Sequence, residues 1–174
     1  RRGSTLPVRI GQQIAWTQWS ASKSNVREQA EKCREHVIAL GKGRPGVFRT
    51  ESTIAPPENR VRLKRELAQS ECLGQTADGK QIYLWQRNGQ EEATILRELG
   101  RLREIAFRAV GEGSGKRRDI DRYDDDYLHL ILWDEEDLEI VGAYRFIPCA
   151  QQQEKQGLEG LYSHTLFHYD ERMA

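Results

Sequence analysis

The chain has 174 residues, of which 37% are apolar and 31% are charged, and its 27 Lys and Arg residues balance its 27 Asp and Glu residues. A chain of this length folds as one domain, or as one domain and a fragment, and buries a core without help from disulfides or metals. Zero net charge removes the usual electrostatic basis for nucleic-acid binding, and no apolar run approaches the roughly 20 residues that span a bilayer.

Two features of the sequence bear on the cell compartment. Cys33, Cys72 and Cys149 are far apart and form no CxxC pair, so we expect neither a zinc site nor a disulfide framework. Lone thiols of this kind are typical of a reducing cytoplasm. Residues 1–10 include no Met and no apolar signal-peptide core, so we expect the chain to begin inside a longer protein.

The N-terminal third of the chain predicts little regular structure apart from one helix. Residues 5–16 have the pattern of two short strands around a Gly turn. Residues 24–40 predict a helix that Ser24 caps, because apolar side chains recur there at helical spacing. These side chains are Val26, Ala30, Cys33, Val37 and Leu40. Residues 46–58, which include two adjacent prolines, predict a linker.

The remaining residues alternate between helical and strand patterns. Apolar side chains at helical spacing predict helices over residues 58–70 and 91–110. The strands that we expect are residues 81–86, 127–133, 138–147 and 161–169, with a hairpin turn at 134–137 and a polar loop at 150–160. Residues 127–133 are apolar on both faces, which favours an interior position in a sheet.

His129 and Asp134 have the spacing of the catalytic HxxxxD motif of glycerolipid acyltransferases. In those enzymes the carboxylate orients the histidine, so the two side chains must meet. Here both residues fall on one expected strand, where an odd offset points them to opposite faces. We therefore interpret His129 as a half-buried strand residue.

Five aspartates gather between residues 119 and 126 and suggest a cation site. The EF-hand pattern fails, because the fifth position from Asp119 is Tyr123 and no Gly follows it. We expect no metal here and favour a solvated acidic loop beside Arg117, Arg118 and Arg122.

Three segments in this order carry a family resemblance: Leu99-Gly-Arg-Leu-Arg-Glu-Ile-Ala-Phe-Arg108, Asp119-Ile-Asp-Arg-Tyr-Asp124 and Val141-Gly-Ala-Tyr-Arg-Phe-Ile147. Together they resemble the N-terminal half of GNAT-type bacterial N-acyltransferases. The resemblance is strongest to ornithine-lipid N-acyltransferases and their hemolysin-labelled relatives, and more distant to acyl-homoserine-lactone synthases. Those families share an LR-x-x-x-F helix, a D-x-x-D loop and a strand ending in R-[FL]. The matching positions are Leu102, Arg103, Phe107, Asp121, Asp124 and Arg145.

The resemblance implies an α/β fold, with a GNAT-like mixed open sheet flanked by helices. We expect this fold to be incomplete at the C-terminus, because no Gly-rich donor-binding turn follows Ile147. The implied reaction transfers a fatty acyl group from acyl-CoA or an acyl-carrier protein to an amine or hydroxyl of a small polar acceptor or lysolipid. No covalently bound cofactor is implied, and the protein would act in the cytoplasm, peripheral to the inner membrane.

The N-terminus has a resemblance of its own. Leu6-Pro-Val-Arg-Ile-Gly-Gln-Gln-Ile14 is similar to the last strand of a lysophospholipid or glycerolphosphate acyltransferase domain, with Gln13 in place of the usual Pro. The implied organisation is the tail of such a domain over residues 1–45, a linker over 46–58 and the GNAT-like half over 59–174.

For the site, the resemblance implies one network at the acceptor pocket. Its residues are Arg103, Asp121, Asp124 and Arg145, and the candidate pocket residues are Phe107, Tyr162 and Ser163. An arginine inside a strand also needs a carboxylate partner on general grounds, because an unpaired buried charge is costly. The alternative is a buried scaffold network without direct chemistry, and no catalytic base is assigned.

Basic residues along the helix at 91–110 have two interpretations. Arg97, Arg101, Arg103 and Arg108 form either a surface for an acidic acyl-carrier protein or anionic lipid headgroups, or an ordinary solvated face with glutamates between them.

Two other functions stay open at this point. One is a non-catalytic module that binds lipid or a partner and regulates an upstream acyltransferase domain. The other is an autoinducer-synthase-like enzyme, which is disfavoured because residues 108–118 lack the Trp that those enzymes carry after the helix Phe.

Overall fold

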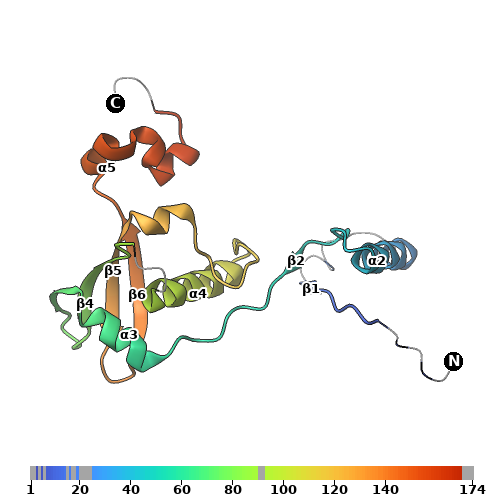
Figure 1. Ribbon diagram of the computed structural model, residues 1–174, viewed down its shortest axis with the longest axis horizontal. Helices are drawn as coiled ribbons and strands as arrows, with labels where there is room; N and C mark the ends of the chain where they lie inside the picture. The colour runs from blue at the N-terminus through green and yellow to red at the C-terminus, as the bar shows by residue number, and fades with distance from the viewer. Residues whose placement is uncertain are drawn as a thin grey trace.

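The computed structural model describes residues 3, 5, 7–14, 16, 19, 25–89 and 93–169. A small N-terminal part contains helix α2 (Val26–Gly41), and a larger part contains a four-stranded sheet; an extended segment joins the two (Figure 1). The network that the sequence predicts lies in the larger part.

An antiparallel sheet in the order β3-β4-β5-β6 organises the larger part. Its strands are β3 (Glu71–Gln75), β4 (Gln81–Gln86), β5 (Leu128–Asp134) and β6 (Glu139–Phe146). Turns with residues in the left-handed region join neighbours, through Gly79 (φ 87°) and Leu138 (φ 53°). β5 has a partner on each side, so its predicted interior position is confirmed. The sequence pattern does not predict β3, because its residues are all exposed and lack apolar alternation.

Helices α3 (Arg60–Leu67) and α4 (Thr94–Ala109) pack on one face of this sheet. Period-two alternation along β5 buries His129, Ile131 and Trp133 on that face. The other core side chains include Leu63 and Leu67 of α3 and Ile95 and Leu99 of α4. Burial of each such apolar side chain stabilises the fold by about 1.5–3 kcal/mol, which fixes α4 against the sheet. The predicted α/β class with an open sheet is confirmed, and all pairings described in that sheet are antiparallel.

The N-terminal helix matches its predicted range closely, but its buried face differs. Its N-cap is Asn25, whose side chain accepts a 3.0 Å hydrogen bond from Glu28 N, and the predicted cap Ser24 lies outside the described residues. The predicted apolar stripe is largely exposed, with Val26 at 83% and Val37 at 64%. The buried side chain is His36, because its ring packs on Phe48 and accepts a hydrogen bond from Phe48 N.

Of the two short strands predicted within residues 5–16, the second is confirmed, and the first is not found among the residues described there. The strand found is β1 (Gln13–Ile14), and it pairs with β2 (Thr50–Glu51) inside the expected linker. Residues 7–12 do not form a strand, and Arg9 bonds instead to the carbonyl of Gly41 at the end of α2, at 2.9 Å.

The C-terminal expectations are also wrong. The expected polar loop contains helix α5 (Cys149–Gln156), whose Ala, Gln, Glu and Lys residues favour helix, and Pro148 precedes its first turn. The expected strand at 161–169 contains a 3-10 helix instead, η3 (Tyr162–Thr165). Its anchor is a hydrogen bond of 2.7 Å from Tyr162 N to the hydroxyl of Tyr127, which fixes the chain as a turn.

Candidate functional site

A cavity of about 470 Å³ lies between α4 and β6. Its wall is mainly apolar: Leu99, Leu102, Ile105, Ala106, Phe107, Ile140, Val141, Gly142 and Ala143. Several of these side chains also reach the surface, since Ile105, Phe107 and Val141 are each 41–42% exposed. Three polar side chains complete the lining, Arg103, His129 and Arg145. The cavity therefore joins an apolar wall to a charged end.

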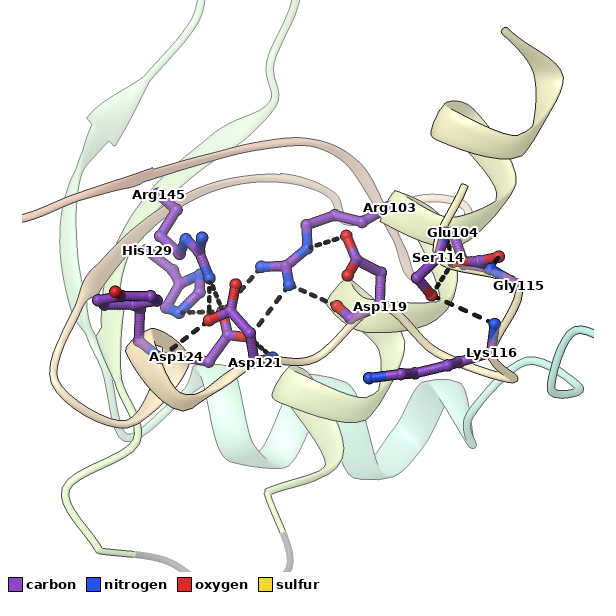
Figure 2. A network of polar contacts seen from close by, with 11 residues as sticks. Arg103, Glu104, Ser114, Gly115, Lys116, Asp119, Asp121, Asp124, His129 and Arg145 are labelled. Atoms are coloured by element: carbon purple, nitrogen blue, oxygen red, sulfur yellow. Dashed lines mark hydrogen bonds and ion pairs between the residues drawn. The ribbon is translucent and has the colours of Figure 1, made fainter. Parts of the chain in front are cut away.

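The charged end is a network centred on Asp124, which is fully buried (Figure 2). Arg103 of α4 donates two hydrogen bonds to its carboxylate, at 2.7 and 3.0 Å. Arg145 of β6 donates from Nη1 to Asp124 at 2.8 Å and to Asp121 at 2.8 Å. The structure thus brings together the four residues of the predicted network, from a helix, a loop and a strand.

The loop that carries the two aspartates is shaped by its own sequence. Residues Arg122–Asp125 form the 3-10 helix η1, and Asp121 caps it by accepting a hydrogen bond from Tyr123 N. In return, Asp124 accepts one of 2.8 Å from Asp121 N, which completes a capping box. Gly100 lets the loop approach α4, because a Cβ there would lie 2.4 Å from Ile120 Cγ1.

Asp124 and Arg145, which form an ion pair at the centre of this network, both stay charged. Burial raises the pKa of the Asp124 carboxyl, but hydrogen bonds from Arg103, the Asp121 backbone and Arg145 outweigh it, so the pKa lies below its usual value. Burial lowers the pKa of the Arg145 guanidinium, but bonds to Asp121 and Asp124 more than compensate, and the pKa is raised. Arg145 also lies over the rings of Tyr127 and Tyr162, at 5.4 and 5.5 Å.

His129 is a site residue that the sequence reasoning missed. It is 2% exposed rather than half-buried, and it lies opposite Arg145 on the neighbouring strand. Among the described residues, its Nε2 has no hydrogen-bond partner and lies 3.8 Å from Oδ1 of Asp124. Desolvation lowers the pKa of His129 to about 4, so the ring is neutral at neutral pH. The signal that could have found it is strand alternation, which places it on the same face as Ile131 and Trp133.

A second buried carboxylate, Glu104, holds the loop after α4 (Figure 2). It accepts bonds of 2.6–3.0 Å from Arg108, from Ser114 N and Oγ, and from Gly115 N. Desolvation raises the pKa of Glu104, but these hydrogen bonds dominate and the pKa is lowered. The same loop accepts a 2.8 Å bond from Ser52 N, which attaches the expected linker to the larger part.

The arginines of α4 do not form a free basic surface. Their carboxylate partners are Glu58 for Arg97, Glu98 for Arg101, Asp119 and Asp124 for Arg103, and Glu51 and Glu104 for Arg108. Three of the four have guanidinium side chains only 14–21% exposed. The four arginines of α4 therefore serve mainly as partners of carboxylates within the protein.

The candidate pocket residues have different positions. Phe107 lines the cavity wall. Tyr162 packs edge-on against Tyr123 and under Arg145, outside the cavity lining. Ser163 hydrogen-bonds Tyr169 and has no contact with the cavity in the described part of the chain.

Within the residues that the structure describes, no group of three or more His, Cys, Asp or Glu side chains could hold a metal ion. Among the described helices, none combines the length and the apolar character needed to cross a membrane.

Comparisons with known proteins agree with this architecture. Residues 102–174 match the acetyltransferase (GNAT) domain. The chain is 37% identical to a glycine N(alpha)-acyltransferase of Phocaeicola vulgatus over 126 residues, which is 70% of this chain and 38% of the relative. It is also 37% identical to a glycine N(alpha)-acyltransferase of Bacteroides thetaiotaomicron over 123 residues, 68% of this chain and 36% of the relative. No solved structure matches significantly.

The chain is thus similar to GNAT-type acyltransferases over these segments, and the mixed α/β structure is consistent with a GNAT-like fold. The narrower resemblance to ornithine-lipid or hemolysin-labelled proteins receives no support from them. The chain spans less than two fifths of the length of the curated relatives that it matches.

Proposed function

We propose that this chain takes part in transfer of a fatty acyl group from a thioester to the amine of a small polar acceptor, in the cavity between α4 and β6. The observation that carries the proposal is the two-part lining of that cavity, with an apolar wall and a charged end. An acyl chain would bind along the apolar wall, since its burial there removes apolar surface from water. A small charged acceptor would bind at the charged end.

The reaction forms an amide and releases a thiol. The acceptor's neutral amine attacks the thioester carbonyl carbon, the C–N bond forms, the C–S bond breaks, and a hydrogen leaves the nitrogen for the sulfur. The protein's part is to hold the two reactants in line, which supplies much of the rate enhancement in such reactions. Three wall residues would bind the acyl chain of the donor: Leu102, Ala106 and Ala143.

The acceptor that we propose is a small amino acid. The curated relatives are named for acylation of glycine. Each bond that the structure gives between Arg145 and the two aspartates uses Nη1, while the guanidinium has further N–H donors in a fork that matches a carboxylate. Arg145 would therefore bind the carboxylate of the acceptor.

The donor that we propose is acyl-CoA, with an acyl-carrier protein as the other source of the same thioester. A fatty product partitions into membranes, so we also propose that the protein works at the surface of the inner membrane in lipid synthesis. A GNAT-type sequence match and the apolar wall support these proposals.

The test is an assay for N-palmitoylglycine from palmitoyl-CoA and glycine, with the protein and with two variants. Ala143→Trp fills the cavity, and we expect at least a tenfold loss of product. Tyr144→Trp is the matched control, because Tyr144 is 70% exposed on the opposite face of β6. Equal activity of the two variants would contradict the proposal. Absence of product with the unaltered protein would instead favour the non-catalytic module.

A further inference from the structure

The imidazole of His129 is buried at the cavity and has no role in the reaction proposed above. It lines the cavity, is 2% exposed, and its Nε2 lacks a hydrogen-bond partner in the part of the chain that the structure describes. Buried polar atoms are nearly always hydrogen-bonded, because an unsatisfied one loses its bonds to water without replacement. An unpartnered nitrogen at a cavity therefore points to a ligand.

The carboxylate beside His129 does not satisfy this nitrogen. Oδ1 of Asp124 lies 3.8 Å from Nε2, beyond hydrogen-bond distance. Asp124 already accepts four hydrogen bonds of 2.7–3.0 Å, from Arg103, Arg145 and Asp121 N. These bonds occupy the lone pairs that a carboxylate offers.

The surroundings of His129 keep it an acceptor. Desolvation lowers its pKa to about 4; among the facing charges, Asp124 raises the pKa, whereas Arg103 and Arg145 lower it further. From β4, the uncharged ring of Trp85 packs on the imidazole at 5.4 Å. A neutral imidazole has one nitrogen with a lone pair, so it can accept a hydrogen bond at neutral pH.

We propose that Nε2 of His129 accepts a hydrogen bond from the amine of the acyl acceptor and orients that amine for attack. The inference rests on the proposed function, in which Arg145 binds the acceptor's carboxylate. His129 and Arg145 are paired positions on β5 and β6, so the sheet itself sets the spacing of the two contacts. His129 binds and orients; the hydrogen that moves to the thiolate sulfur in the reaction comes from the amine, and the imidazole stays neutral.

The first test is steady-state kinetics of the full chain with glycine and palmitoyl-CoA. His129→Phe keeps a ring but removes the acceptor, and we expect the KM for glycine to rise at least tenfold while the KM for palmitoyl-CoA stays within twofold. His129→Gln keeps an acceptor and should recover much of the glycine affinity. His164→Phe is the matched control, because His164 is exposed outside the cavity lining. An unchanged KM for glycine in folded His129→Phe would overturn the inference.

The second test needs neither turnover nor a variant. In protein with 15N-labelled histidine, glycine should shift the Nε2 resonance of His129, whereas acetate, which lacks the amine, should not. Equal shifts with both ligands would mean that the shared carboxylate causes them, no shift with glycine would mean that the amine does not contact Nε2, and either result would overturn the inference. If glycine alone shifts Nε2 but no N-palmitoylglycine forms, the proposed reaction fails while the amine contact stands.

Discussion

His129 and Arg145 are direct partners across β5 and β6, and both line the cavity beneath α4. One is a neutral base whose Nε2 meets no hydrogen-bond partner within the described ranges, and the other is a cation fixed by two aspartates. This pairing gives the inner end of the cavity an acceptor and a donor side by side, which suits a molecule that carries both an amine and a carboxylate.

The ion pairs of Arg145 are predicted to matter for stability. Arg145→Ala leaves the buried Asp124 with one guanidinium instead of two, and loss of a buried partner costs about 3 kcal/mol or more. The control is Arg60→Ala, because the Arg60–Glu139 pair is about half exposed, and such pairs contribute less than about 1 kcal/mol. Urea unfolding measures both variants. Equal midpoints would show that the Asp124 network does not stabilise the fold.

Acid should destabilise the protein through His129 before it affects the carboxylates. The pKa of His129 is about 4 in the folded protein and about 6.5 in the unfolded chain, so the unfolded state binds more protons between these values. Its contribution is therefore fully present above pH 6.5 and is lost as pH falls toward 4, at a total cost of about 3 kcal/mol.

Comparison of the wild type with His129→Gln isolates this effect, since all other titrating groups are common to both. The difference in unfolding free energy between the two proteins should shrink as pH falls from 7 to 4. A pH-independent difference would mean that His129 titrates normally in the fold.

The loop that carries Asp121 and Asp124 lies close to α4 at Gly100. We therefore predict that a larger side chain at Gly100 destabilises the fold. Gly100→Ala places a Cβ 2.4 Å from Ile120 Cγ1 and 3.2 Å from Asp119 O, so the loop must move, at about 1–3 kcal/mol. Gly41→Ala is the control, because a Cβ there meets no atom of the described residues within 4 Å. Thermal unfolding should separate the two variants, and a stable Gly100→Ala protein would contradict the close approach.

Glu104 is predicted to order the loop after α4. Glu104→Gln removes the negative charge that accepts from Arg108, Ser114 and Gly115, and each charged hydrogen bond contributes about 1.5–3 kcal/mol. Amide hydrogen exchange at Ser114 and Gly115 should accelerate in this variant. Glu112→Gln, on the exposed Glu112 nearby, should leave both amides protected. Unchanged protection of the Ser114 and Gly115 amides in Glu104→Gln would show that Glu104 does not order this loop.

The sequence predicts the part of the fold where apolar periodicity is strong. Apolar periodicity predicts β4, β5, β6, α3 and α4. The need of a strand arginine for a carboxylate predicts a partner for Arg145, and the family resemblance identifies Asp121 and Asp124 as that partner. Apolar periodicity does not predict the polar elements, because the residues of α5 bury little apolar surface and β3 is exposed along its length. Strand alternation alone could have predicted the burial of His129, but the position of its Nε2 beside Asp124 depends on the loop that carries Asp121 and Asp124, which local sequence does not encode.

The central claim is that an acyl chain and a small amino acid meet in the cavity between α4 and β6, and binding of N-palmitoylglycine tests it most directly. In NMR titrations of the full chain, this product should shift the amides of Ala106 and Ala143 together with the side chain of His129. Shifts confined to Leu130 and Tyr144, which pair with each other on the opposite face of the sheet, would contradict the account.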